Sequence, residues 1–159
     1  GIKGTLRAEM KIYLDASTLN RPFDDQSVPR NRLEAEAMIV ILDAAERGYI
    51  ELISSSALLY ENLMSPLVAR REYVATYLDM ASAFVTLDEI LRERAQEIER
   101  QGIASLDALH LASAERAGAE WFVTCDDHIL RKARRGKLPV RFRVSTPVEF
   151  VTERRMLDG

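Results

Sequence analysis

Cysteine is nearly absent from this chain of 159 residues. The single cysteine, Cys125, excludes an internal disulfide and favours a protein of the reducing cytoplasm. The apolar runs are far shorter than the roughly 20 residues that span a bilayer, so we expect no membrane association. Residues 1–9 also lack the apolar segment of a secretory signal. With 47% hydrophobic and 30% charged residues, the composition is typical of a soluble globular protein.

Histidine is scarce as well, and the two present, His110 and His128, have no partners at zinc-binding spacings. The net charge of −3 argues against a protein that holds nucleic acid by overall charge alone. It is compatible with a nuclease whose acids are masked by metal and whose basic residues are clustered. Arg131, Arg134 and Arg135 lie in a late basic cluster, which is interpreted either as a contact surface for a phosphate backbone or as a solvated helix face.

Short apolar segments alternate with amphipathic ones along the chain. Strands are predicted at residues 11–15, 49–53, 83–87, 120–124 and 140–144. Helices are predicted at residues 29–47, 57–64, 66–80, 88–101, 106–117 and 126–135, and from residue 147. Such alternation predicts a parallel sheet with helices on both faces. We expect a single domain over residues 10–159, with Met10 as a natural start and residues 1–9 as upstream or artificially added sequence.

Four carboxylates fall at or near strand ends and helix starts. Asp15 ends the first strand, Glu61 lies about one turn into the helix after the second, Asp107 is in a first helical turn, and Asp126 follows the fourth strand. In open α/β sheets, ligands bind at the carboxyl ends of the strands. Clustered carboxylates repel one another, and hard oxygen ligands suit Mg²⁺ or Mn²⁺. Such an ion can activate water and offset charge on a phosphodiester.

Each acid also has a purely structural interpretation. Asp126 or Asp127 can be the N-cap of the following helix. Asp107 gains from the helix dipole in a first turn, and Glu61 can be an exposed helix residue. Asp15 is the hardest to explain in this way, because the segment offers no helix for it to cap. The four acids together are therefore a more specific signal than any one of them.

The segments that carry these acids resemble a PIN domain. The matching segments are Ile12–Ser17, Glu61, Leu106–Ala112 and Val123–Asp127, and the resemblance covers nearly the whole chain from Met10 onward. Within that family the chain is most similar to small VapC-like proteins, many of which are the toxin nuclease of a toxin–antitoxin pair. The resemblance implies a three-layer α/β/α sandwich with a central parallel sheet of four to five strands.

The same resemblance implies a function. It implies a divalent-metal-dependent endoribonuclease that uses Mg²⁺ or Mn²⁺, hydrolyses RNA phosphodiesters and leaves a 5′-phosphate and a 3′-hydroxyl. The implied catalytic residues and metal ligands are Asp15, Glu61, Asp107 and Asp126. The implied partners are an RNA substrate, a small antitoxin protein and a second copy of the chain in a homodimer.

Several other positions are assigned or questioned by the resemblance. Ser17 and Thr124 match hydroxyl positions that support the metal or the phosphate. The pair Asp126 and Asp127 leaves the fourth acid ambiguous by one residue, and we prefer Asp126 because it lies two residues after Thr124. The long loop at residues 20–29 departs from the pattern, and its two aspartates, at positions 24 and 25, could add or misplace a ligand.

His110 lies three residues after Asp107, so both face the same side of one helix. It is interpreted as a supporting residue of the site or, alternatively, as a half-buried packing residue beside it. Two other functions are compatible with parts of this pattern. A non-catalytic module that binds RNA or antitoxin is disfavoured because all four acids are present. An Asp-dependent phosphatase with Asp15 as nucleophile is disfavoured because position 17 is Ser rather than a second Asp.

Overall fold

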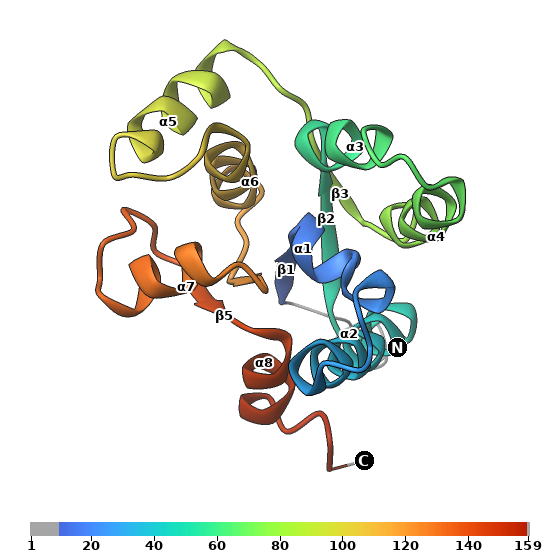
Figure 1. Ribbon diagram of the computed structural model, residues 1–159. Coiled ribbons are helices and arrows are strands. Elements are labelled where there is room, and N and C mark those ends of the chain that lie inside the picture. The colour runs from blue at the N-terminus through green and yellow to red at the C-terminus, as the bar shows by residue number, and fades with distance from the viewer. Residues whose placement is uncertain (1–9, 159) are drawn as a thin grey trace, which may run out of the picture.

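Five strands form one parallel sheet in the computed structural model, which describes residues 10–158 (Figure 1). The strands are β1 (Lys11–Leu14), β2 (Glu51–Ser55), β3 (Ala83–Val85), β4 (Trp121–Val123) and β5 (Arg143–Ser145). Their order is β3-β2-β1-β4-β5, and every neighbouring pair is parallel. The predicted parallel sheet is confirmed. Residues 1–9, which we expected to lie upstream of the fold, are outside the described residues.

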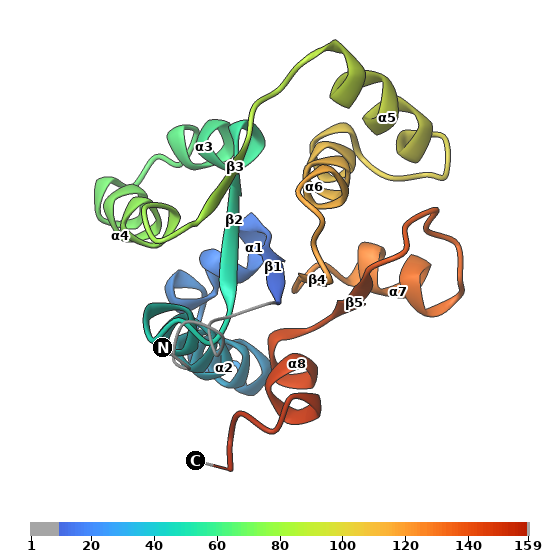
Figure 2. The same ribbon diagram turned by 180° about the vertical axis from the view of Figure 1, so that it is seen from behind.

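Helices cover both faces of this sheet. They are α1 (Ala16–Leu19), the 3-10 turn η2 (Arg21–Phe23), α2 (Pro29–Glu46), α3 (Ser56–Leu63), α4 (Val68–Leu78), α5 (Glu89–Glu99), α6 (Ser105–Arg116), α7 (Asp127–Arg134) and α8 (Pro147–Glu153). The pair α5 and α6 lies on one side of the strands, and the pair α2 and α8 lies on the other (Figures 1 and 2). The result is a three-layer α/β/α sandwich. No helix within residues 10–158 has the length and apolar composition to cross a membrane.

The sequence located most elements within a few residues, and the differences have local causes. Strand β2 starts at Glu51 rather than at Tyr49, which is exposed after the turn at Gly48, where φ is +82°. It extends to Ser55, whose hydroxyl then accepts the Leu58 N–H at 3.1 Å and caps α3. Ser105, which precedes the predicted helix 106–117, is the first residue of α6 and not its cap. The N-cap is Ala104, and the Ser105 hydroxyl donates to a Glu99 carboxylate oxygen instead.

The central strand β1 fixes the position of the site. Ile12, Tyr13 and Leu14 are at most 3% exposed, and the Tyr13 ring stacks on Phe122 of β4 at 5.3 Å. Pairing with β4 continues past the last strand residue, because the Asp15 N–H donates to the Val123 carbonyl at 3.2 Å. The backbone at Asp15 is therefore held by the sheet, directly at its carboxyl edge.

Candidate metal-binding active site

One cavity at the carboxyl edge of the sheet brings the four predicted acids together. We call it the acid cavity, and its volume is about 210 Å³. Its lining residues are Asp15, Ala16, Ser17, Asn20, Arg21, Asp24, Glu61, Asp107, His110 and Asp126. The acids come from the end of β1, from α3, from α6 and from the N-cap of α7. Residues up to 111 positions apart in the chain thus share one small space, as the α/β topology predicted.

Asp15 is almost fully buried, and both of its carboxylate oxygens accept hydrogen bonds. Oδ1 accepts the Ser17 hydroxyl at 2.6 Å and the Thr18 N–H at 3.1 Å, and Oδ2 accepts the Thr124 hydroxyl at 2.6 Å. Burial raises the pKa of Asp15, and these hydrogen bonds oppose the shift. The contact with Thr18 makes Asp15 the N-cap of α1. Our expectation that Asp15 had no helix to cap was wrong, because α1 has only four residues and shows no periodicity in the sequence.

Ser17 and Thr124, which we expected to support a metal or a phosphate, form hydrogen bonds with Asp15 itself. Each hydroxyl donates to the Asp15 carboxylate and accepts a backbone N–H from the start of the α7 segment. Ser17 Oγ accepts from Cys125 N at 3.0 Å, and Thr124 Oγ1 accepts from Asp126 N at 3.0 Å. The two hydroxyls therefore tie the end of β1 to the segment that carries Asp126.

Asp107 and Asp126 occupy helix starts that face the cavity. Burial, followed by the negative charges of Asp126 and Asp15, raises the pKa of Asp107 to about 6. The Asp126 carboxylate accepts the Ile129 N–H at 2.9 Å, so Asp126 is an N-cap as well as a cavity residue. Asp127 is exposed and lies 2.9 Å from Arg30 Nη2 in an ion pair. Of the two candidates for the fourth acid, only Asp126 lines the cavity.

Glu61 reaches the cavity from α3 and is bonded to a histidine. His110 Nε2 lies 2.7 Å from Glu61 Oε1, and His110 Nδ1 lies 2.7 Å from the Tyr13 hydroxyl. The His110 side chain is 1% exposed, so the expectation of a half-buried packing residue was wrong. Tyr13, which the sequence presented only as part of a buried strand, is thereby linked to the site. Its signal was hidden because its partner is 97 residues away.

The loop at residues 20–29 places one acid and one cation at the cavity. Asp24 lines it but is paired with Arg21, whose Nη1 lies 3.1 Å from Asp24 Oδ2. Arg21 also forms an ion pair with Glu34, which is 3% exposed. Arg21 Nε lies 2.9 Å from Glu34 Oε1, and Arg21 Nη2 lies 2.6 Å from the same oxygen. Asp25 is exposed and accepts from Ser27 instead. Arg21 is the one cationic residue among those that line the cavity, and no periodicity or motif in the sequence singles it out.

The predicted phosphate-binding residues lie away from this lining. Arg131 and Arg134 are in the last turn of α7, and Arg135 is its C-cap. None of the three lines the acid cavity, and Arg134 lies 3.2 Å from Glu149 in an ion pair. Their role in binding RNA stays a prediction.

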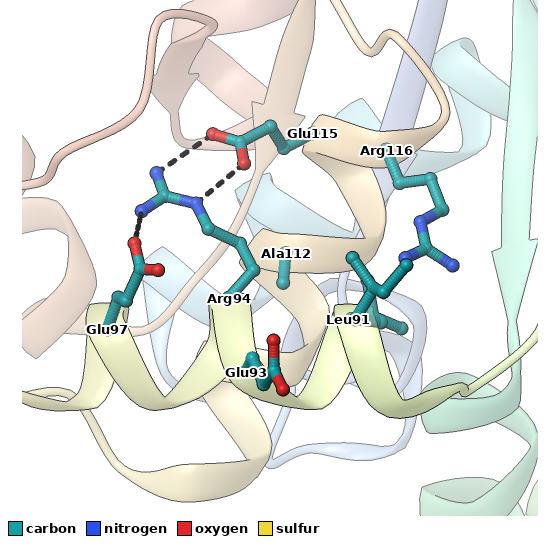
Figure 3. A pocket seen from close by; sticks show the side chains of 8 residues that line it. Leu91, Glu93, Arg94, Glu97, Ala112, Glu115 and Arg116 are labelled. Atoms are coloured by element: carbon teal, nitrogen blue, oxygen red, sulfur yellow. Dashed lines mark hydrogen bonds and ion pairs between the residues drawn. The ribbon is translucent and has the colours of Figure 1, made fainter.

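A second cavity also has carboxylates in its lining, but it differs from the acid cavity because arginines lie among them. It has a volume of about 390 Å³ and lies between α5 and α6 (Figure 3). Its central residue, Arg94, lies 2.7 Å from Glu115 and 3.0 Å from Glu97, so these two carboxylates are already paired with a cation. In the acid cavity, by contrast, Asp15, Asp107 and Asp126 have no ion pair with any residue from 10 to 158.

The donor set of the acid cavity fits a hard divalent cation. All the unpaired acids offer oxygen, the ligand that Mg²⁺ and Mn²⁺ prefer. Burial and, after it, repulsion by the neighbouring acids already raise the pKa of Asp107, and a cation would relieve the repulsion. Within residues 10–158, no three Asp, Glu, His or Cys side chains are grouped closely enough to ligate one ion directly. The fit is therefore to an ion such as Mg²⁺, which keeps several waters and takes only one or two carboxylates directly.

Comparison with known families decides which proteins share this arrangement. The PIN domain profile matches residues 12–135. The chain belongs to the PIN domain family. PIN domains are generally nucleases, and such nucleases generally use divalent metal ions. The predicted family is confirmed.

Solved structures with the same fold support the assignment. VapBC2 from Rickettsia felis, bound to a DNA fragment from their promoter, matches with a TM-score of 0.53 and 15% identity, over 86% of this chain and 98% of that one. PAE2754 from Pyrobaculum aerophilum matches with a TM-score of 0.54 and 17% identity, over 94% of this chain and 91% of that one. At these identities the likeness establishes the fold alone, which confirms the predicted sandwich. No curated protein matched the sequence.

Proposed function

We propose that this PIN domain is a divalent-metal-dependent endoribonuclease and that the acid cavity is its active site. The observation that carries the proposal is the convergence of Asp15, Glu61, Asp107 and Asp126 on one cavity that is rich in unpaired carboxylates. Membership of the PIN family supports nuclease chemistry. The choice of RNA as substrate rests on the resemblance to VapC-like proteins. We treat residues 10–159 as one catalytic domain.

In this proposal Asp15, Asp107 and Asp126 hold one Mg²⁺ or Mn²⁺ directly or through water, and Glu61 completes the site or binds a second ion. The bound ion supplies activation of water and stabilisation of charge on the phosphodiester. Attack of water on phosphorus would form one P–O bond, break the bond to the 3′ oxygen, and leave a 5′-phosphate and a 3′-hydroxyl.

The residues around the acids prepare the cavity for this role. Ser17 and Thr124 keep the buried Asp15 carboxylate oriented and stabilise its ionised form. With a pKa of about 6, Asp107 is ionised near neutral pH and available as a ligand. Because Asp24 is paired with Arg21, we do not include it among the ligands.

The proposal is tested by cleavage of a mixed RNA pool and a matched single-stranded DNA pool, each with Mg²⁺, with Mn²⁺ and with chelator. We expect metal-dependent cleavage of the RNA. Asp15→Asn should reduce it by more than the roughly 10–100-fold loss typical of residues that only support a metal ligand. Asp127→Asn is the matched control, because Asp127 is an exposed acid outside the cavity. Undiminished cleavage by Asp15→Asn would contradict the assignment of the active site. Cleavage of the DNA pool without cleavage of the RNA pool would show that the substrate is DNA and not RNA.

We further propose a small antitoxin protein as partner, a cytoplasmic location and a homodimer. The similar structure from Rickettsia felis, VapBC2 bound to promoter DNA, supports the antitoxin partner by analogy. For the dimer, the apolar residues of segment 66–80 are the candidate contact surface. Of these, Val74 is buried, and Tyr73, Tyr77 and Leu78 pack against the core, whereas Leu67 is exposed. Light scattering of the purified chain should give twice the mass of 18.0 kDa, and a monomer would contradict the dimer.

A further inference from the structure

A chain of four polar side chains connects the interior of the sheet to the acid cavity. Ser55 Oγ lies 2.7 Å from Tyr13 Oη, Tyr13 Oη lies 2.7 Å from His110 Nδ1, and His110 Nε2 lies 2.7 Å from Glu61 Oε1. The four residues come from β2, β1, α6 and α3. Ser55, Tyr13 and His110 are at most 1% exposed, so water does not compete for the Ser55–Tyr13 and Tyr13–His110 bonds.

The hydrogen bonds in this chain can run in only one direction if every group is satisfied. A carboxylate only accepts, so Nε2 of His110 must carry a proton and donate to Glu61. In the neutral ring Nδ1 is then an acceptor, and it receives the Tyr13 hydroxyl. The Tyr13 oxygen in turn accepts the Ser55 hydroxyl, while Ser55 Oγ accepts the Leu58 N–H at 3.1 Å. Running Tyr13 the other way would leave the Ser55 proton buried without an acceptor, which is costly.

Glu61 depends on this chain for its orientation. Its side chain is 35% exposed, on a helix of eight residues. Among residues 10–158, His110 is the only hydrogen-bond partner of its carboxylate. The bond engages Oε1, which leaves Oε2 available for another contact. The imidazole cannot turn to release Glu61 without breaking its own bond to Tyr13 inside the core.

We propose that His110 is a positioning residue for Glu61, locked as the Nε2–H tautomer by Tyr13 and Ser55, so that Glu61 presents one fixed, free carboxylate oxygen to the acid cavity. The consequence for metal binding rests on the proposed function. The tautomer of His110 and the orientation of Glu61 do not rest on the proposed function.

Two variants of His110 separate positioning from packing. The amide nitrogen of Gln reaches the place of Nε2, whereas the shorter Asn amide lies near Nδ1 and cannot reach Glu61. Binding of Mn²⁺, measured by calorimetry on the full chain, should fall about tenfold in His110→Asn. It should be largely restored in His110→Gln. His128→Asn is the control, because His128 is exposed and bonds the Gly102 carbonyl. Equal affinities of the Asn and Gln variants would overturn the inference.

The tautomer is measured on the unaltered protein by ¹⁵N NMR, with His128 as the second histidine signal. We expect His110 to show a protonated Nε2 and an unprotonated Nδ1 at neutral pH. A proton on Nδ1 would overturn the inference, even if the Asn and Gln variants failed to fold. A protein that shows the Nε2–H tautomer and binds Mn²⁺ but cleaves no RNA would refute the proposed function and leave the role of His110 intact.

Discussion

The two sides of the acid cavity hold their carboxylates in different ways. On the sheet side, Asp15 is 2% exposed and accepts three hydrogen bonds, two of them from residues two and three positions further along the chain. On the helix side, Glu61 has a side chain that is 35% exposed and, within residues 10–158, bonds a single partner, His110. Asp15 is fixed by the backbone of β1 and its neighbour β4, whereas Glu61 is fixed by a side chain from another helix.

This difference shows which contacts hold each carboxylate in place. At the end of β1 the sheet itself sets the position of the acid, and the hydroxyls of Ser17 and Thr124 set only its rotation. At α3 the packing of the helix sets the position of Glu61, and the rotation of its carboxylate depends on His110 of α6, which Tyr13 of β1 holds in turn. Loss of one hydrogen bond should therefore lower the stability of the protein more on the buried sheet side. On the helix side it should mainly increase the mobility of the carboxylate.

The largest effect on stability should come from Thr124→Val, which removes a buried hydroxyl with little change of shape. We expect the free energy of unfolding to fall by about 2–3 kcal/mol, because the buried Asp15 carboxylate loses one of its donors and the Asp126 N–H loses its acceptor. Urea denaturation measures this loss. The control is Ser113→Ala, a buried hydroxyl that bonds only the Leu109 carbonyl of its own helix and should cost about 1 kcal/mol or less. Equal losses would contradict the special role of the sheet side.

A smaller loss is expected from Tyr13→Phe, on the helix side. The ring and its stacking on Phe122 remain, but His110 Nδ1 and the Ser55 hydroxyl each lose a partner. We expect a loss of about 1–2 kcal/mol in the same denaturation experiment. A loss greater than that of Thr124→Val would reverse the proposed ranking of the two sides.

The smallest effect concerns the charge of Asp107 in the metal-free protein. Its folded pKa of about 6 lies above the ordinary value of 3.8, so the folded state binds more protons than the unfolded state between these values. Stability should therefore fall as pH rises from about 4 to 6, by about 1 kcal/mol once solvent screening is allowed for. Asp107→Asn should flatten this part of the stability curve, measured with chelator present. An unchanged slope would show that Asp107 does not carry the raised pKa that burial and the neighbouring acids are expected to give it.

The sequence predicted the fold and the acids because both depend on local patterns. Apolar segments alternating with helical ones imply the parallel sheet, and a parallel sheet gathers Asp15 and Asp126 at one edge. Glu61 and Asp107 could be added because their helices begin at that same edge. The helix α1 escaped prediction because four residues are too few to show a helical period.

What the sequence could not supply were the contacts between distant residues. The bond from Tyr13 to His110 joins positions 97 apart, and the bond from His110 to Glu61 joins positions 49 apart. No spacing rule connects them. Arg21 was missed for a similar reason, since it is placed beside the cavity by the buried Glu34 of another helix. Folding alone brings these partners together.

Calorimetric titration with Mg²⁺ and Mn²⁺ tests most directly whether the converging carboxylates form a metal site. The unaltered chain and Asp127→Asn should bind the ions with equal affinity, because Asp127 lies outside the acid cavity. Asp15→Asn should lose that binding while keeping its fold, as judged by circular dichroism. Equal binding by Asp15→Asn and Asp127→Asn, or no binding by the unaltered chain, would contradict the account.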